Sequence, residues 1–161
     1  MSDAKPQEEM DAGFVKRAEE EARRAKAEGN AFFAKGEFAG AMGKYDEAVR
    51  SACKARMHLG GIASEQVGQL LASVEGKGRA KAEAEGVPWE LNAFVFAINR
   101  LKGSPLGAPE DFGGSQLFCN RAVCAARMGD WERCAREAQA AKVLAESWFQ
   151  PKMRVCTPFR R

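Results

Sequence analysis

Apolar side chains recur at a helical period along most of the chain. Residues 8–28 are rich in Ala, Glu, Arg and Lys, which are strong helix formers, and their small apolar side chains share one face. This pattern predicts a long helix that continues through residues 29–35 and ends at Gly36. A second helix is predicted from Phe38 to about Met57, where two consecutive glycines soon follow.

The middle of the chain shows the same period with interruptions. Residues 62–75 place Ile, Val and Leu at helical spacing, and the glycines of residues 76–78 are expected to break this helix. The polar residues 79–86 are expected to form either a helical turn or a linker. Residues 87–103 have a proline suited to a first helical turn, an apolar stripe and a terminal glycine, which predicts an amphipathic helix.

The last third contains a loop and further helices. Residues 104–114 carry two prolines and three glycines and are predicted to be a loop. Two helices are expected at about 115–128 and 131–145, and a short last helix from Ser147. Because no segment alternates with the period of a strand, we expect an all-α fold.

Two segments repeat one arrangement of small, acidic and aromatic residues. In residues 29–49 and 122–142, a small residue is followed seven positions later by Gly, an acid and an aromatic side chain. These triplets are Gly36, Glu37 and Phe38, and Gly129, Asp130 and Trp131. Small side chains let two antiparallel helices approach closely, and the aromatic side chain fills the closed end of the hairpin.

This pattern resembles the tetratricopeptide (TPR) repeat, a 34-residue helix-turn-helix unit. The resemblance implies TPR-like antiparallel helical hairpins of the α-solenoid type, with a helical insertion between two repeats. Its boundaries would be a flexible N-terminus at 1–7 and a single domain at 8–161. Within that domain we expect repeat one at about 22–55, an insertion at about 56–114, repeat two at about 115–148 and a partial capping helix at 149–156.

Among TPR proteins, the sequence is most similar to co-chaperones that hold the acidic C-terminal tail of a cytosolic heat-shock chaperone in a carboxylate clamp. The resemblance implies a peptide-binding site at Lys26, Asn30, Asn120, Gln150 and Arg154. Asn120 is followed by Arg121, as is typical of that family, whereas Gln150 stands where the family has a lysine. The alternative for Lys26 and Asn30 is an ordinary solvated helix face.

The resemblance implies a non-enzymatic adaptor that binds a protein or peptide with an acidic C-terminal tail. Ammonium and amide donors would bind the two carboxylates of a terminal Asp, at micromolar affinity or about −8 kcal/mol. The alternative is a structural subunit or scaffold of a larger assembly, whose groove is filled by its own insertion or by a helix of a partner.

Composition supports a globular protein without a catalytic or metal site. The 161 residues are 45% hydrophobic and 29% charged, and the net charge of +3 is too small to indicate nucleic-acid binding. Neither a membrane span nor a targeting peptide is recognisable, so we expect a cytoplasmic protein with five reduced cysteines. His58 and Cys53 lack the residues that would complete a metal or catalytic site, and no cofactor is expected.

Overall fold

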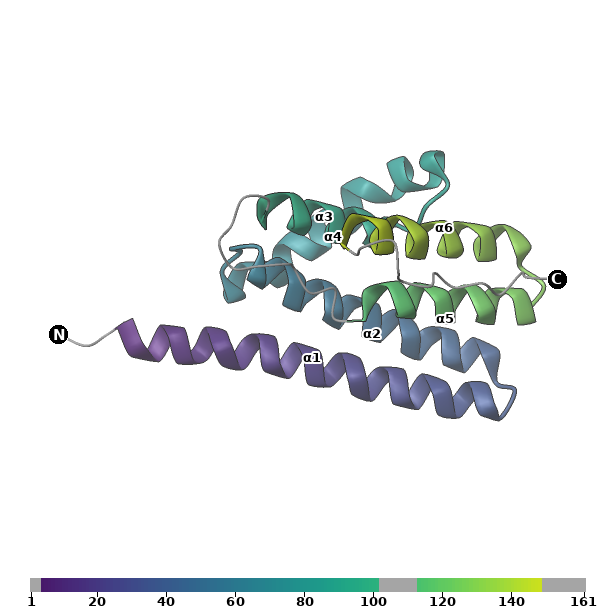
Figure 1. The fold of residues 1–161 in the computed structure, drawn as a ribbon, viewed down its shortest axis with the longest axis horizontal. Helices are drawn as coiled ribbons and strands as arrows, with labels where there is room; N and C mark the ends of the chain where they lie inside the picture. Colours follow the sequence, from purple (N-terminus) through teal and green to yellow (C-terminus); the bar gives the residue numbers. More distant parts are fainter. Residues whose placement is uncertain (1–3, 102–112, 149–161) are drawn as a thin grey trace.

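The computed structural model describes the backbone of residues 4–101 and 113–148, and the side chains of residues 13–96 and 113–145. All regular secondary structure in these ranges is α-helical, which confirms the all-α prediction. The helices are α1 (Ala4–Ala34), α2 (Phe38–Leu59), α3 (Ser64–Glu85), α4 (Trp89–Leu101), α5 (Gly114–Arg127) and α6 (Trp131–Trp148) (Figure 1).

The helices α1 and α2 form one antiparallel hairpin, and α5 and α6 form another (Figure 1). Both turns share two backbone hydrogen bonds. Gly36 and Glu37 donate their backbone N–H groups to residues three and five positions earlier, and Gly129 and Asp130 do the same. Each glycine has a positive φ, 76° and 78°, as the Schellman motif at a helix C-terminus requires. The repeated triplets therefore mark two turns of one geometry.

Small side chains bring the helices close together. The buried core of the first hairpin includes four alanines, Ala22 and Ala25 of α1 and Ala41 and Ala48 of α2. The two hairpins are joined mainly where α2 packs against α5. In Figure 1, α1, α2, α5 and α6 accordingly form successive layers. This stacking buries one continuous apolar core.

The insertion forms part of the same core. Its helices α3 and α4 pack against each other and against α2, and α4 also contacts α6. Val67 and Leu71 of α3 are buried, and so are Leu91 and Phe94 of α4. The Phe94 ring meets the ring of Phe118 in α5 edge-on, with 6.0 Å between the ring centres. The described apolar residues of the insertion are therefore part of the core that the hairpins form.

Helix α3 does not break at residues 76–78, contrary to the sequence-based expectation. Its helical backbone continues to Glu85 and ends at Gly86, whose φ is 70°. Two glycines in a helix cost roughly 1 kcal/mol each. The Glu75 carboxylate offsets part of this cost, since it pairs at 2.6 Å with Arg79 one turn later and at 2.6 Å with Arg50 of α2.

The ends of other elements also differ from their predicted boundaries. Helix α1 begins at Ala4, so residues 4–7, expected to be flexible, are helical. Backbone N–H groups in the first turn of a helix have no acceptor within the helix. Pro6 is compatible with this turn because the N–H group that proline lacks is not needed there. Helix α6 extends to Trp148. Most of the loop expected at residues 104–114 lies outside the described residues. The capping helix expected at 149–156 lies entirely outside them.

Candidate functional site

The predicted binding residues of the first hairpin lie on α1. Asn30 is exposed, and Lys26, one turn earlier, is half-buried. The Tyr45 hydroxyl group of α2 donates a hydrogen bond of 2.6 Å to Oδ1 of Asn30. Tyr45 itself is buried, so the contact anchors an exposed amide to the interior of the hairpin.

Asn120 lies on α5 in a similar local arrangement. Its side-chain Oδ1 accepts a hydrogen bond of 2.9 Å from Nε2 of Gln116, one turn earlier on the same helix. In both Asn30 and Asn120, the amide oxygen is thus occupied. Among the described residues, neither Nδ2 has an acceptor, so each amide keeps its donor group for another molecule.

The structure does not bring these residues into one closed pocket. Helix α1 packs against α2, and α2 packs against α5, while α1 and α5 make little direct contact. Within the described residues, no hydrogen bond or ion pair links Lys26 or Asn30 to Asn120. Gln150 and Arg154 lie outside the described part of the chain. Convergence of the five predicted positions therefore stays a prediction.

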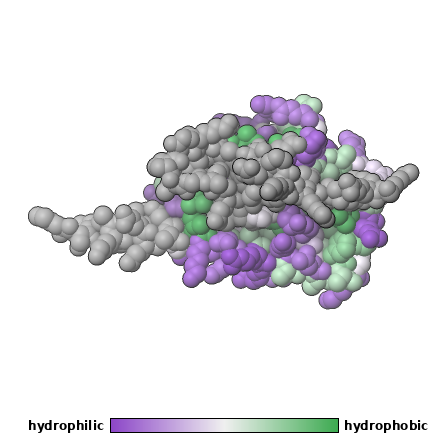
Figure 2. All heavy atoms as spheres, viewed as in Figure 1, coloured by the Kyte–Doolittle hydropathy of each residue, from purple (hydrophilic) through white to green (hydrophobic). Residues whose placement is uncertain are grey.

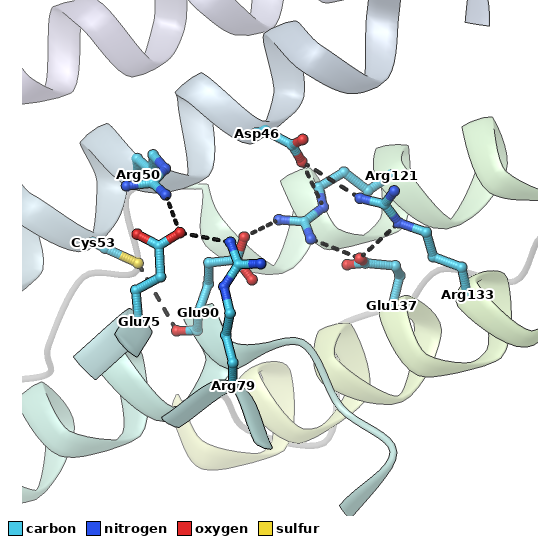
Figure 3. Close-up of polar contacts among 9 residues, drawn as sticks. All are labelled: Asp46, Arg50, Cys53, Glu75, Arg79, Glu90, Arg121, Arg133 and Glu137. Carbon is cyan, nitrogen blue, oxygen red and sulfur yellow. Dashed lines mark hydrogen bonds and ion pairs between the residues drawn. The ribbon is translucent and has the colours of Figure 1, made fainter. Parts of the chain in front are cut away.

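A second polar site, which the sequence analysis did not predict, centres on Arg121 (Figure 3). This arginine is 3% exposed and binds a carboxylate from each of three other helices. Its Nη2 lies 2.6 Å from Glu137 of α6, its Nη1 3.0 Å from Glu90 of α4, and its Nε 3.3 Å from Asp46 of α2. Arg121 therefore ties the insertion and both hairpins together.

Arg133 completes this cluster at its solvent side. Its guanidinium lies 3.6 Å from the Glu137 carboxylate and 3.8 Å from that of Asp46. Three carboxylates thus share two guanidinium groups. One oxygen each of Glu90 and Glu137 is buried without a hydrogen-bond donor, so the cluster retains unmet acceptor capacity.

Burial dominates the electrostatics of this cluster. It raises the pKa of Asp46 and of Glu137, although Arg121 and Arg133 act in the opposite direction. Burial acts to lower the pKa of Arg121, but Glu137, Glu90 and Asp46 outweigh it, and the pKa is raised overall. Arg121 is consequently charged at every accessible pH.

A cavity of about 440 Å³ lies beside the cluster, between the insertion and the hairpins. Arg50 at its edge stacks over the Trp89 ring, 5.2 Å from the ring centre. The charged lining residues are Arg50, Arg79, Arg121, Arg133, Arg136, Asp46, Glu83, Glu90, Asp130 and Glu137. Because cations and anions are equal in number, the cavity favours neither an anionic nor a cationic ligand.

A second groove of about 520 Å³ runs between α1 and α2. Lys44 within it pairs with Glu28 at 2.8 Å and with Glu47 at 3.3 Å. Lys26, Asn30 and Asn120 line neither this groove nor the cavity beside Arg121. The ion pairs within these depressions involve Lys44 in the groove, and Arg121 and Arg133 in the cavity.

One feature of the sequence indicates that Arg121 has a buried ionic partner. Arg121 lies on the face of α5 that also carries Phe118, Ala122 and Ala125, all of which are buried. A charged residue on the apolar face of a helix indicates a buried ionic partner. Its partners cannot be chosen from the sequence, because they lie on three other helices.

Comparison with known proteins gives no match: no protein-family model, no curated protein and no solved structure matches this chain. No helix in the described ranges is both long and apolar enough to cross a membrane. On the face shown in Figure 2, the hydrophobic residues that are described form small patches among hydrophilic ones. In the described part of the chain, no group of three or more His, Cys, Asp or Glu side chains is arranged to hold a metal ion.

The buried carboxylates give the fold a defined pH dependence. The ordinary pKa values of Asp46 and Glu137 are 3.8 and 4.5, and both are raised in the folded chain. Their stabilising contribution is therefore complete below about pH 4 and is lost as the pH rises through the folded pKa values. We expect the stability deficit of Glu137→Gln relative to wild type, measured by urea unfolding, to shrink as the pH rises from 4 to 8.

The matched control is Glu20→Gln, the same change on the exposed surface of α1. Its stability should follow that of the wild type at each pH. A deficit of Glu137→Gln that grows with pH would show that the carboxylate is favoured in its charged form.

Proposed function

We propose that this chain is a non-enzymatic, TPR-like interaction module that binds a short acidic C-terminal peptide in the cytoplasm, such as the tail of a heat-shock chaperone. The repeated Schellman turns and the stacking of α2 on α5 support the repeat architecture.

The amide groups of Asn30 and Asn120 carry the proposal. Each is held by its oxygen, and each presents an N–H₂ group without an acceptor among the described residues. The Lys26 ammonium lies one turn before Asn30. It forms no ion pair with any of the described residues. Donors of this kind suit a terminal carboxylate, whose oxygens only accept hydrogen bonds.

The position of the insertion is compatible with this use of α1. Helices α3 and α4 pack against α2 and α6, and α4 meets α5 through Phe94 and Glu90. They do not pack extensively against α1. Helices α3 and α4 therefore leave accessible the side of α1 that carries Lys26 and Asn30.

The second hairpin offers some support for the alternative, a structural subunit of a larger assembly. Trp131 is 62% exposed and Met128 is 43% exposed at its closed end. An exposed aromatic side chain at this position suits contact with a further helix, supplied by a partner.

A fluorescence titration with a peptide ending in Glu-Glu-Val-Asp tests the proposal. We expect micromolar binding by the free acid, and weaker binding by about tenfold for Asn120→Ala or Arg154→Ala, because each loses one charge-assisted contact. Gln150→Lys should bind more tightly because it adds a cation. Equal binding of the amidated peptide, or no binding of either form, would contradict the carboxylate clamp.

A further inference from the structure

We infer that Tyr45 is a positioning residue that fixes Asn30 as a hydrogen-bond donor, so that α1 recognises ligands through their acceptor oxygens. The inference rests on the proposed function and specifies the ligand chemistry of the same site. It follows from how the first hairpin is packed around Gly29, Asn30 and Tyr45.

The absence of a side chain at Gly29 allows the Tyr45 ring to lie against α1. A Cβ atom at Gly29 would be only 2.6 Å from Cε1 of Tyr45 and 2.8 Å from its Cδ1. The ring is therefore in contact with the α1 backbone one residue before Asn30. Tyr45 is 2% exposed, which leaves its ring little freedom to move.

This placement brings the Tyr45 hydroxyl group within 2.6 Å of Asn30 Oδ1. Because a hydroxyl group could also accept from an amide N–H₂ group, the orientation of Asn30 follows from the observed donation to its Oδ1. Burial raises the pKa of Tyr45, so the hydroxyl group keeps the proton that it donates. The Asn30 Nδ2 group consequently points away from Tyr45 and remains a donor.

The result is a pair of donors on one helix face. Lys26 carries an ammonium group that can only donate, and it precedes Asn30 by one helical turn. Together they favour a carboxylate and disfavour ammonium or guanidinium groups, which have no acceptor to offer. The chemistry of the ligand is thus set partly by a buried tyrosine that does not touch it.

A double-mutant cycle separates positioning from general packing. Affinity for the free-acid peptide ending in Glu-Glu-Val-Asp is measured for the full chain and for Tyr45→Phe, Asn30→Ala and the combination of both. Tyr45→Phe keeps the ring and removes only the hydroxyl group. We expect it to weaken binding by about three- to tenfold in the wild-type background and to have no effect when Asn30 is already Ala.

Asn30→Asp provides an independent readout. Its carboxylate can still accept from Tyr45 but presents a charged oxygen to the ligand, so we expect a larger loss of affinity than for Asn30→Ala. The control is Gln69→Ala, which removes an exposed amide on α3 and should leave the affinity unchanged.

The possible results distinguish the two hypotheses. If the wild-type chain does not bind the peptide, the proposed function fails and this inference fails with it. If the wild type binds but Tyr45→Phe has no effect, or the same effect in both backgrounds, only the positioning role is overturned. Wild-type affinity of Asn30→Asp would overturn the assignment of Asn30 as a donor.

Discussion

Substitution of Arg121 by methionine is expected to lower the free energy of unfolding by about 3–5 kcal/mol, because it leaves buried carboxylates without their shared cation. Glu90 and Glu137 are buried and have one oxygen each within 3.0 Å of Arg121. Methionine fills much of the same volume but offers no hydrogen-bond donor. Urea unfolding at pH 7 measures the effect.

The matched control is Arg23→Met. Arg23 pairs with Glu19 on the surface of α1, where its side chain is 70% exposed, so the change should stay within about 0.5 kcal/mol. Neutralising Glu90 and Glu137 to Gln in the Arg121→Met background should recover part of the loss. An Arg121→Met chain as stable as the wild type would show that the cluster is not held by its central charge.

Truncation of Phe94 to alanine should lower the free energy of unfolding by about 3–5 kcal/mol. Phe94 is fully buried, contacts the Phe118 ring and lies so close to Gly114 that a Cβ atom there would be 2.9 Å from it. Because the surrounding helices come from the insertion and the second hairpin, the cavity would weaken their joint core. Thermal unfolding followed by far-ultraviolet circular dichroism provides the measurement.

Phe96→Ala on the same helix is the control. Phe96 is 40% exposed, so its truncation should cost much less than that of Phe94. If Phe94→Ala instead melts the insertion in a separate early transition and leaves the hairpins intact, α3 and α4 would be an appended unit rather than part of one core.

The sequence predicts the local features of this fold well. Glycines at positions 36 and 129 indicate the hairpin turns because only glycine takes a positive φ without strain. Periodic apolar positions likewise indicate where the helices lie. The glycines of α3 locally favour a break, whereas the structure adds a contact from outside the helix, the pairing of Glu75 beside them with Arg50 of α2.

The candidate sites are predicted less completely. A spacing of four residues identifies Lys26 and Asn30 as neighbours on one face, which helical geometry guarantees. Their relation to Asn120 depends on the angle between hairpins, and that angle is set by packing across α2 and α5. The Arg121 cluster depends even more on tertiary structure, since its acids are unremarkable until the helices assemble.

The place of the insertion in the chain bears on how the protein folds. In an uninterrupted solenoid each hairpin meets the next in sequence, so contacts stay local and units can melt one at a time. Here α2 must find α5 across the whole of α3 and α4, and Arg121 binds acids that precede and follow it along the chain. Such distant contacts slow the search for the native state and favour a single all-or-none transition.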